Sequence, residues 1–162
     1  MTTWFISDTH FGEQPARRQK AAGLTASELD ARILGNWRDE VSDGDEIWHL
    51  GDIGKSWRVL LALPGRKHLI LAHNSDRRPV IAKSGVFATI QERHRLVANG
   101  HTLDLIHNPD DSEPTPGVPL VHGHYHYRAP GPGCVSVCVD HCNWGPVSLD
   151  RVLAQLHCPA SA

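Results

Sequence analysis

Six Asp, Asn and His residues each end a short apolar run in this sequence, and all are of types that bind metal ions. Each run has the composition of a buried strand, so each strand would deliver one polar side chain to the rim of a sheet. Open α/β sheets place their ligands at such a rim, and we therefore expect one site built from several strand ends. The residues are Asp8, His10, Asp52, Asn74, His107 and His122, with His124 following as a seventh polar group.

These donors are carboxylate, amide and imidazole groups without a thiolate. Such donors suit pairs of manganese, iron or zinc ions better than a structural zinc. We expect two divalent metal ions, Mn²⁺ in the first instance, with Fe, Zn, Ni or Co as alternatives. The cysteines do not follow the Cys-x2-Cys spacing of zinc ribbons and are interpreted as buried free thiols. They are Cys134, Cys138, Cys142 and Cys158.

The first half of the chain alternates between strand and helix signals, which predicts βαβ units and a parallel sheet. Strands are expected at residues 3–7, 46–50 and 67–72, with a short helix near 56–63. Asp45 precedes the second of these strands, so we interpret it as a turn residue and not as a ligand.

A longer helix is expected from residue 25, where Thr25 and Glu28 form a capping box. Apolar residues then recur every four positions and give the helix one apolar stripe. The stripe consists of Leu29, Ile33, Trp37 and Val41.

The second half of the chain is predicted to begin with a β-hairpin. Residues 86–98 and 101–107 would be its arms, and Asn99-Gly100 is a strong signal for a type I′ turn. Residues 108–119 read as an irregular loop. Two further strands are expected at 120–122 and 134–140, followed by a terminal helix near 149–157.

The order and context of the polar residues resemble those of the calcineurin-like metallophosphoesterases, over nearly the whole chain. That family carries Asp-x-His, Gly-Asp, Gly-Asn-His-Asp/Glu, a lone His and Gly-His-x-His, in this order. The matching segments are Asp8-Thr9-His10, Gly51-Asp52, His73-Asn74-Ser75-Asp76, His107, and Gly123-His124 with His122 just before it. Residues 7–12 and 146–150 look like a small bacterial or phage branch of the family.

The resemblance implies a single domain over residues 1–162 with an α/β (α+β) fold. The expected architecture is a four-layer αββα sandwich of two mixed β-sheets flanked by helices. It also implies that Asp52 bridges two metal ions, which together bind the phosphoryl oxygens and generate a hydroxide nucleophile. The first metal would take Asp8, His10, Asp52 and His124, and the second Asp52, Asn74, His107 and His122.

One segment departs from the family pattern. The His that the family places beside the scissile phosphate is Ser75 here, and the preceding Gly is replaced by His73. A positioned acid typically contributes ~10²–10⁴ in rate, and a serine hydroxyl is too weak an acid to replace it. His73 is either a surrogate acid or a steric passenger. The residues to which we assign catalytic roles are Asp52, His73, Asn74, Ser75 and Asp76.

The expected function is a metal-dependent phosphodiesterase acting on small diesters whose leaving groups need little help, such as 2′,3′-cyclic nucleotides or aryl phosphodiesters. The alternatives are a weakened regulatory module that binds metal and phosphate, and a nuclease acting on RNA or DNA ends. The chain has 16 basic and 18 acidic residues, so no extended nucleic-acid surface is expected. No apolar stretch is long enough for a membrane span and no signal peptide is evident, so a cytoplasmic location is expected. The oligomeric state is left open.

The remaining histidines and the loop arginines have two interpretations each. Isolated histidines are taken as surface or core residues rather than ligands: His49, His68, His94, His101, His126, His141 and His157. The arginines are either phosphate contacts or solvated side chains: Arg17, Arg18, Arg77, Arg78 and Arg128. Tyr125 would either stack on a base or fill the core.

Overall fold

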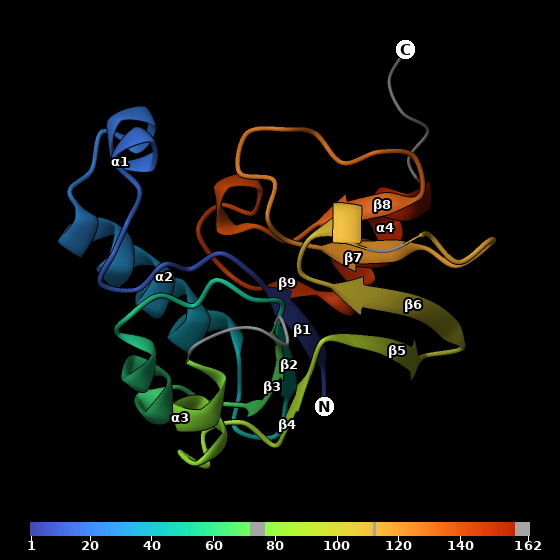
Figure 1. Cartoon of the computed structure of the whole chain (residues 1–162), viewed down its shortest axis with the longest axis horizontal. Helices are drawn as coiled ribbons and strands as arrows, with labels where there is room; N and C mark the ends of the chain where they lie inside the picture. The colour runs from blue at the N-terminus through green and yellow to red at the C-terminus, as the bar shows by residue number, and fades with distance from the viewer. Residues whose placement is uncertain (72–76, 112, 158–162) are drawn as a thin grey trace.

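The computed structural model describes residues 1–71, 77–111 and 113–157. It contains a five-stranded sheet in the order β4-β3-β2-β1-β9, in which β1 to β4 are parallel and β9 runs antiparallel to β1 (Figure 1). The strands of this sheet are β1 (Thr3–Ile6), β2 (Glu46–His49), β3 (Arg66–Ile70), β4 (Thr89–Gln91) and β9 (Val147–Ser148).

A second, four-stranded sheet has the order β5-β6-β7-β8. Its first pair is antiparallel, whereas β6, β7 and β8 run parallel, so this sheet is mixed as well. Its strands are β5 (Arg93–Ala98), β6 (His101–Ile106), β7 (Leu120–His122) and β8 (Cys134–Ser136).

Helices lie outside the two sheets (Figure 1). The longest is α2, whose first turn carries the predicted capping box: the Thr25 side chain accepts from the Glu28 amide, and the Glu28 carboxylate accepts from the Thr25 amide. The α-helices are α1 (Ala16–Ala22), α2 (Ala26–Glu40), α3 (Arg78–Ala82) and α4 (Leu149–His157). The 3₁₀ helices are η1 (Trp57–Ala62), η2 (Pro109–Asp111) and η3 (Val139–His141).

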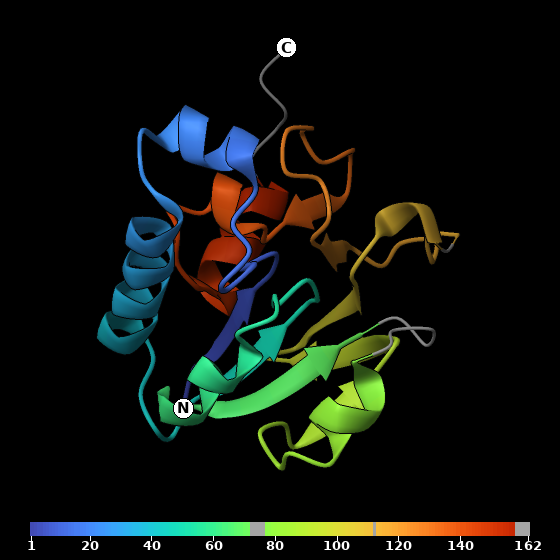
Figure 2. The ribbon, with the colours of Figure 1, turned by 60° about the vertical axis from the view of Figure 1, so that its left-hand side comes forward.

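Two hydrophobic cores separate the layers. One face of the five-stranded sheet packs through Ile6 and Ile47 against Ile33 and Trp37 of α2. Its other face forms a second core with the four-stranded sheet and α4, in which Phe5, Trp48, Leu105, Val121 and Val152 take part. Period-two alternation of side chains along β1 and β2 explains why both faces of this sheet are apolar. Figure 2 shows helices α1 and α2, in blue and cyan, along one side of β1.

The predicted fold class is confirmed: two mixed sheets are flanked by helices in an αββα sandwich. Helix α4 contacts β8 of the four-stranded sheet and β1 and β9 of the five-stranded sheet, and contributes to the second core. None of the helices within the described ranges is long and apolar enough to cross a lipid bilayer.

The predicted hairpin is confirmed in its turn but not in its first arm. Asn99 and Gly100 have φ angles of 51° and 77°, as a type I′ turn requires. Residues 86–98, however, do not form a single arm. The chain pairs with β3 as β4, passes Glu92, and then joins the second sheet as β5. The sequence of residues 86–98 gives no sign of which sheet each part joins, so this crossover was not predicted.

Besides the 3₁₀ helices η2 and η3, three short elements were not predicted from the sequence. Helix α1 has no apolar periodicity, begins after Pro15 and has no side-chain cap. Helix α3 is five residues long, and β9 is a two-residue strand held against β1. Elements this short carry too few residues for a periodic signal.

Asp45 was predicted to be a turn residue, and its contacts confirm this. Its carboxylate accepts hydrogen bonds from the backbone amides of Ser42 and Thr2 and from Nε1 of Trp4. The amide hydrogen bonds from Ser42 and Thr2 lower the pKa of Asp45. The turn and the first strand are therefore tied together at the end of the molecule that carries the amino terminus.

The two sheets are joined beyond the carboxyl ends of β1 and β8. Ser7 donates its amide to the Val137 carbonyl at 3.0 Å and accepts from the Val139 amide at 3.1 Å, which forms a parallel bridge between Ser7 and Cys138. The carboxyl ends of β1, β2, β6, β7 and β8 are thereby brought to one edge of the sandwich.

Candidate metal centre

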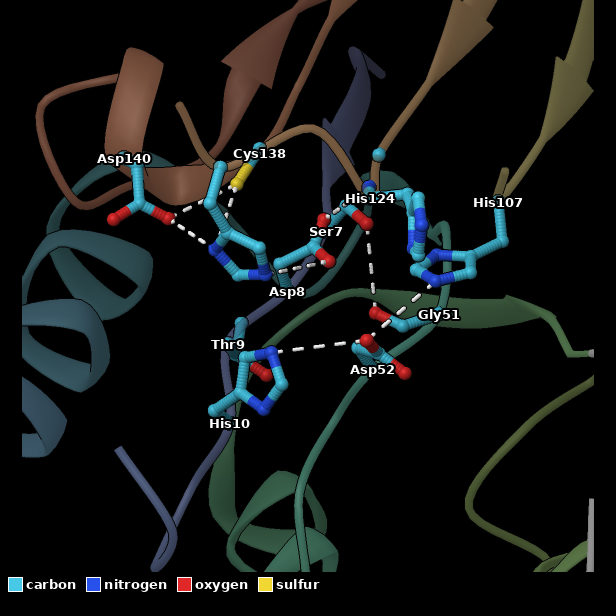
Figure 3. A network of polar contacts seen from close by, with 12 residues as sticks. Ser7, Asp8, Thr9, His10, Gly51, Asp52, His107, His124, Cys138 and Asp140 are labelled. Carbon is cyan, nitrogen blue, oxygen red and sulfur yellow. Dashed lines mark hydrogen bonds and ion pairs between the residues drawn. The ribbon is translucent and has the colours of Figure 1, made fainter. Parts of the chain in front are cut away.

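Metal-competent side chains from both sheets meet at this edge (Figure 3). Asp8 and His10 follow β1, Asp52 follows β2, and His107 follows β6. The loop after β7 supplies two further histidines, His124 and His126. The prediction that strand ends assemble one cluster therefore agrees with the placement of these residues.

Backbone hydrogen bonds hold the loops together. The Asp8 amide donates to the Gly51 carbonyl, and the His10 amide donates to the Asp52 carbonyl, both at 3.0 Å. The amide of His124 donates to Oδ2 of Asp8 at 2.9 Å. The loops after β1, β2 and β7 thus fix one another, and the side chains they carry are held at short range.

Four residues of the cluster have left-handed backbone conformations. The φ angles are 59° at Asp8, 47° at His10, 51° at Asp52 and 68° at His124. Such a conformation costs a non-glycine residue ~1–2 kcal/mol. Strain of this kind is concentrated at functional sites, where the surrounding structure enforces it. The turns therefore direct these side chains toward one another at the expense of local stability.

Two glycines allow the close approach of the loops. A Cβ at Gly51 would lie 2.6 Å from Nδ1 of His107. A Cβ at Gly123 would lie 2.0 Å from Oγ of Ser7 and 2.5 Å from Oδ2 of Asp8. Neither position can carry a side chain without displacing a residue of the cluster.

The side chains form two groups that share one carboxylate. In each group the potential ligand atoms lie within 4.8 Å of one another. Asp52 belongs to both, and its Oδ2 lies 3.7 Å from Nε2 of His10 and 3.5 Å from Nε2 of His107. The first group is Asp8, His10, Asp52 and His126, and the second is Asp52, His107 and His124.

The first group contains buried polar atoms that are not satisfied by protein. Oδ1 of Asp8 and Nε2 of His10 are buried and have no hydrogen-bond partner among the described residues. A buried unsatisfied group of this kind costs ~1–3 kcal/mol. Both atoms are metal donors that face the same space, so the donor set fits a divalent cation in the first group.

Hydrogen bonds to the far side of two imidazoles orient their ligand nitrogens. Nδ1 of His107 lies 2.6 Å from the Leu50 carbonyl, which can only accept, so Nδ1 carries the proton. Nδ1 of His126 lies 2.7 Å from Oδ2 of Asp140. In each case Nε2 faces a carboxylate of the cluster, as in metal sites where an outer acceptor sets the tautomer of a ligand His.

The electrostatics of the cluster favour an ionised Asp52 and a neutral His10. His107, at hydrogen-bonding range, and the nearby His10 hold the pKa of Asp52 well below its usual range. Burial lowers the pKa of His10. Burial also lowers the pKa of His49 to about 3, and this neutral ring contacts Oγ1 of Thr9 at 3.0 Å. Burial acts to lower the pKa of His107, but its contact with Asp52 and the charges of Asp8 and Asp52 outweigh it and raise this pKa, so His107 has to lose a proton before a cation binds.

The structure divides the histidines differently from the expectation. His124 was assigned to the first metal but lies in the second group with His107, and His126, interpreted as an isolated histidine, lies in the first group. His122 belongs to neither. It still pairs within the sheet, opposite Ile106 and Ser136, so it precedes the turn that carries the ligands.

The missed residue had a usable sequence signal. Gly123-His124-Tyr125-His126 fits the spacing Gly-His-x-His without adjustment, whereas counting from His122 shifts the pair by two residues. Nδ1 of His122 donates to the Gly123 carbonyl at 2.7 Å, and its Nε2 is buried without a hydrogen-bond partner among the described residues. This atom faces the interior near the cluster but is not grouped with its ligands.

Four of the predicted catalytic residues, His73, Asn74, Ser75 and Asp76, lie outside the described residues. Their roles remain predictions. The loop arginines can be placed in part. Arg18 is fully buried and is not available to a substrate phosphate, whereas Arg17 and Arg128 lie over the rings of Tyr127 and Tyr125.

A third cluster, formed by His126, Cys138 and Asp140, also has metal-ligand types at short range. The guanidinium of Arg18 already contacts Asp140 with two nitrogens, so this position holds a cation of the protein itself. Burial raises the pKa of the Cys138 thiol, which donates to Asp140. The predicted free-thiol state holds for Cys134, Cys138 and Cys142, and Cys158 lies outside the described residues.

Comparisons with known proteins yield uncharacterised relatives. No protein-family model matches the chain. An uncharacterized protein of Methanocaldococcus jannaschii is 28% identical over 168 residues, covering 93% of this chain and 88% of that protein. The gene 66 protein of Mycobacterium phage D29 is 27% identical over 160 residues, which cover 77% of this chain and 78% of that protein. The crystal structure of a protein of unknown function from Aquifex aeolicus is similar, with a TM-score of 0.72 and 23% identity. The match covers 96% of this chain and 98% of that chain. The last comparison shows a shared fold.

Proposed function

We propose that this protein is a metal-dependent phosphoesterase with two divalent metal ions, Mn²⁺ in the first instance. The observation that carries the proposal is the overlap of two ligand groups at Asp52. A carboxylate that two donor sets share can hold two cations at the ~3.5–4 Å separation used in two-metal hydrolysis. Oδ1 of Asp8 and Nε2 of His10, which are buried and have no hydrogen-bond partner within the described ranges, support the same conclusion.

Each residue of the cluster has a distinct part in this proposal. Asp8, His10 and His126 would complete the first position around Asp52, and His107 and His124 the second. Two metal ions held there would bind phosphoryl oxygens and lower the pKa of a water molecule, which supplies the nucleophile. The Asp52 side chain is 45% exposed, so a substrate phosphate can approach the shared carboxylate from solvent.

The proposed substrates are small phosphodiesters with good or strained leaving groups, including aryl phosphodiesters and 2′,3′-cyclic nucleotides. The reason is the family resemblance, in which Ser75 stands at the position of the His beside the scissile phosphate. Without a positioned acid, an alkoxide leaves ~10²–10⁴ times more slowly than it otherwise would. A nitrophenolate departs without that help, so the choice of leaving group should decide the rate.

A parallel assay tests the proposal. Metal-stripped protein reconstituted with Mn²⁺ is incubated with an aryl phosphodiester, the matching aryl phosphomonoester, a 2′,3′-cyclic nucleotide and a labelled oligonucleotide. We expect the diester and the cyclic nucleotide to be hydrolysed, with the aryl diester faster than the aryl monoester. His107→Ala, which removes a ligand of one group, is the matched inactive control.

The same assay separates the other functions. A clear preference for the monoester would make the protein an ordinary phosphatase. Cleavage confined to the oligonucleotide would indicate a nuclease, and metal and phosphate binding without turnover would indicate a regulatory module. Each of these three results would contradict the phosphodiesterase proposal.

A further inference from the structure

A buried polar network lies behind the first ligand group, on the side away from the second group. At its centre is Arg18 of α1, whose side chain is fully buried. Nε of Arg18 donates to Oδ1 of Asp140 at 2.9 Å, and one terminal nitrogen donates to Oδ2 at 2.5 Å. The other terminal nitrogen donates to Oε1 of Gln14 at 2.8 Å. The guanidinium therefore fixes both oxygens of Asp140.

The network reaches both loops that carry first-group ligands. Oδ2 of Asp140 lies 2.7 Å from Nδ1 of His126. Gln14, which accepts from Arg18, donates its amide to the Thr9 carbonyl at 2.7 Å, between Asp8 and His10 in the chain. Arg18 thus connects the loop after β1 to the loop after β7 through one hydrogen-bonded unit.

Stability alone does not account for this arrangement. Burying a charged pair costs desolvation that its mutual attraction often fails to offset, and apolar residues of the same volume are frequently as stable. The ion pair does, however, set the tautomer of His126, which means that it determines which ring nitrogen carries the proton. If Nε2 carries the proton, it points at Oδ1 of Asp8, 3.5 Å away, and cannot bind a cation.

Arg18 and Asp140 compete for Nδ1 of His126, while Sγ of Cys138 lies farther away, at 3.7 Å. A terminal nitrogen of Arg18 lies 2.9 Å from it and can only donate, which would favour an unprotonated Nδ1. Oδ2 of Asp140 is closer, at 2.7 Å, and can accept. The same Arg18 nitrogen already donates to this oxygen. The acceptor therefore decides the contact, Nδ1 keeps the proton, and Nε2 presents its lone pair to Asp8.

We propose that Asp140, held in place by Arg18, is a positioning residue that sets the Nδ1–H tautomer of His126 and so prepares the first group for a divalent metal ion. This inference rests on the metal centre of the proposed function, but not on its chemistry. It assigns roles to two residues that contact neither metal nor substrate. It also explains why Arg18 of helix α1 is buried.

Metal titration of stripped protein tests the inference without any measurement of turnover. In calorimetric titrations with Mn²⁺, Asp140→Asn should weaken one of the two binding events by ~10–100-fold and leave the other unchanged. Asp140→Glu, which keeps the carboxylate, should lose less. Equal Mn²⁺ affinities in Asp140→Asn and the wild type would overturn the inference.

A matched control comes from the second sheet. Asp104 has a side chain as buried as that of Asp140, 6% against 8% exposed, and it pairs with Arg95 through two bonds of 2.8 and 3.1 Å. Asp104→Asn breaks an ion pair of the same type, whose arginine is half exposed where Arg18 is buried, without touching a candidate ligand. It should leave both Mn²⁺ affinities as they are. An equal loss of affinity in both variants would mean that Asp140 acts through general stability, against the inference.

A spectroscopic measurement covers the case in which the Asp140 variants do not fold. Long-range ¹H–¹⁵N correlation spectra of wild-type protein loaded with Cd²⁺ report which imidazole nitrogen of His126 is protonated. We expect a protonated Nδ1 and a metal-bound Nε2, and an unprotonated Nδ1 would overturn the inference. If these results hold while no phosphoester is hydrolysed, the proposed function fails and the positioning role stands. A chain that binds neither Mn²⁺ nor Cd²⁺ contradicts both.

Discussion

At the scale of single residues, the cluster depends on positions where a small or absent side chain lets loops meet. Gly123 lies between His122 and His124, and its Cα is in contact range of Ser7 and Asp8. The hydrogen bond from the His124 amide to Asp8 needs this approach. The ligand geometry is therefore set by backbone contacts as much as by the ligands themselves.

Gly123→Ala should consequently impair metal binding. The new Cβ would meet Oγ of Ser7 at 2.0 Å and Oδ2 of Asp8 at 2.5 Å, so Asp8 has to move. Overpacking of this kind typically costs ~1–3 kcal/mol of stability. We expect at least tenfold weaker Mn²⁺ binding in a titration, with a lower midpoint in thermal unfolding.

Gly131→Ala is the matched control for this substitution. Nothing lies within 4 Å of a Cβ at that position, and the residue belongs to the same loop after β7. It should bind Mn²⁺ as the wild type does. If both alanine variants bind alike, close approach at Gly123 is not what shapes the cluster.

Sequence reasoning identified donor types at this scale but not their partners. Asp8, His10, Asp52 and His107 were predicted as ligands because each follows a strand, and these four lie in the two groups. The pairing of His124 and His126 depends on a turn with φ of 68° at His124. Strand periodicity says nothing about where side chains point after such a turn.

At the scale of elements, a stack of one tryptophan and two histidine rings joins the two sheets. Trp48 of β2 lies between His68 of β3 and His94 of β5, with ring centroids 4.4 Å apart on both sides. Nε2 of His68 also contacts Glu46 at 2.8 Å. The stack therefore connects β5 of the second sheet to the central strands of the first.

This stack predicts a loss of stability in mild acid. Burial lowers the pKa of His68 and of His94 in the folded protein. An unfolded histidine takes up its proton near pH 6.5. Since the unfolded state binds more protons below that pH, the contribution is fully present above pH ~6.5 and is lost as the pH falls.

Urea unfolding at pH 7.5 and 5.0, with EDTA present to exclude metal release, measures this effect. The free energy of unfolding should fall between the two pH values. The fall should be smaller in His68→Gln combined with His94→Gln. An identical fall in the double variant would show that other groups cause the acid sensitivity.

The elements themselves were predictable where the pattern was long. Helix α2 and the turn at Asn99-Gly100 were found because a capping box, a four-residue apolar repeat and a turn dipeptide each have a direct physical cause. The change of sheet between β4 and β5 was not found. Its cause is the packing of both strands on different layers, which leaves no local mark in residues 86–98.

At the scale of the whole molecule, the sandwich brings five strand ends to one edge. The parallel bridge from Ser7 to Cys138 holds the sheets together there. The αββα layering was expected from the family resemblance, whereas the single cluster could be predicted because parallel strands share a direction and so end on the same side. The division of the ligands between two metal positions could not be predicted, because it depends on how the two sheets face each other.

The central claim is that Asp52 is shared by two metal positions, and metal stoichiometry tests it most directly. Wild-type protein loaded with Mn²⁺ and freed of excess metal should contain close to two ions per chain by elemental analysis. Asp52→Asn should lower the occupancy of both positions, because each loses a ligand, whereas His124→Ala should lower chiefly one. Full occupancy by two ions in Asp52→Asn, or a single ion in the wild type, would contradict the account.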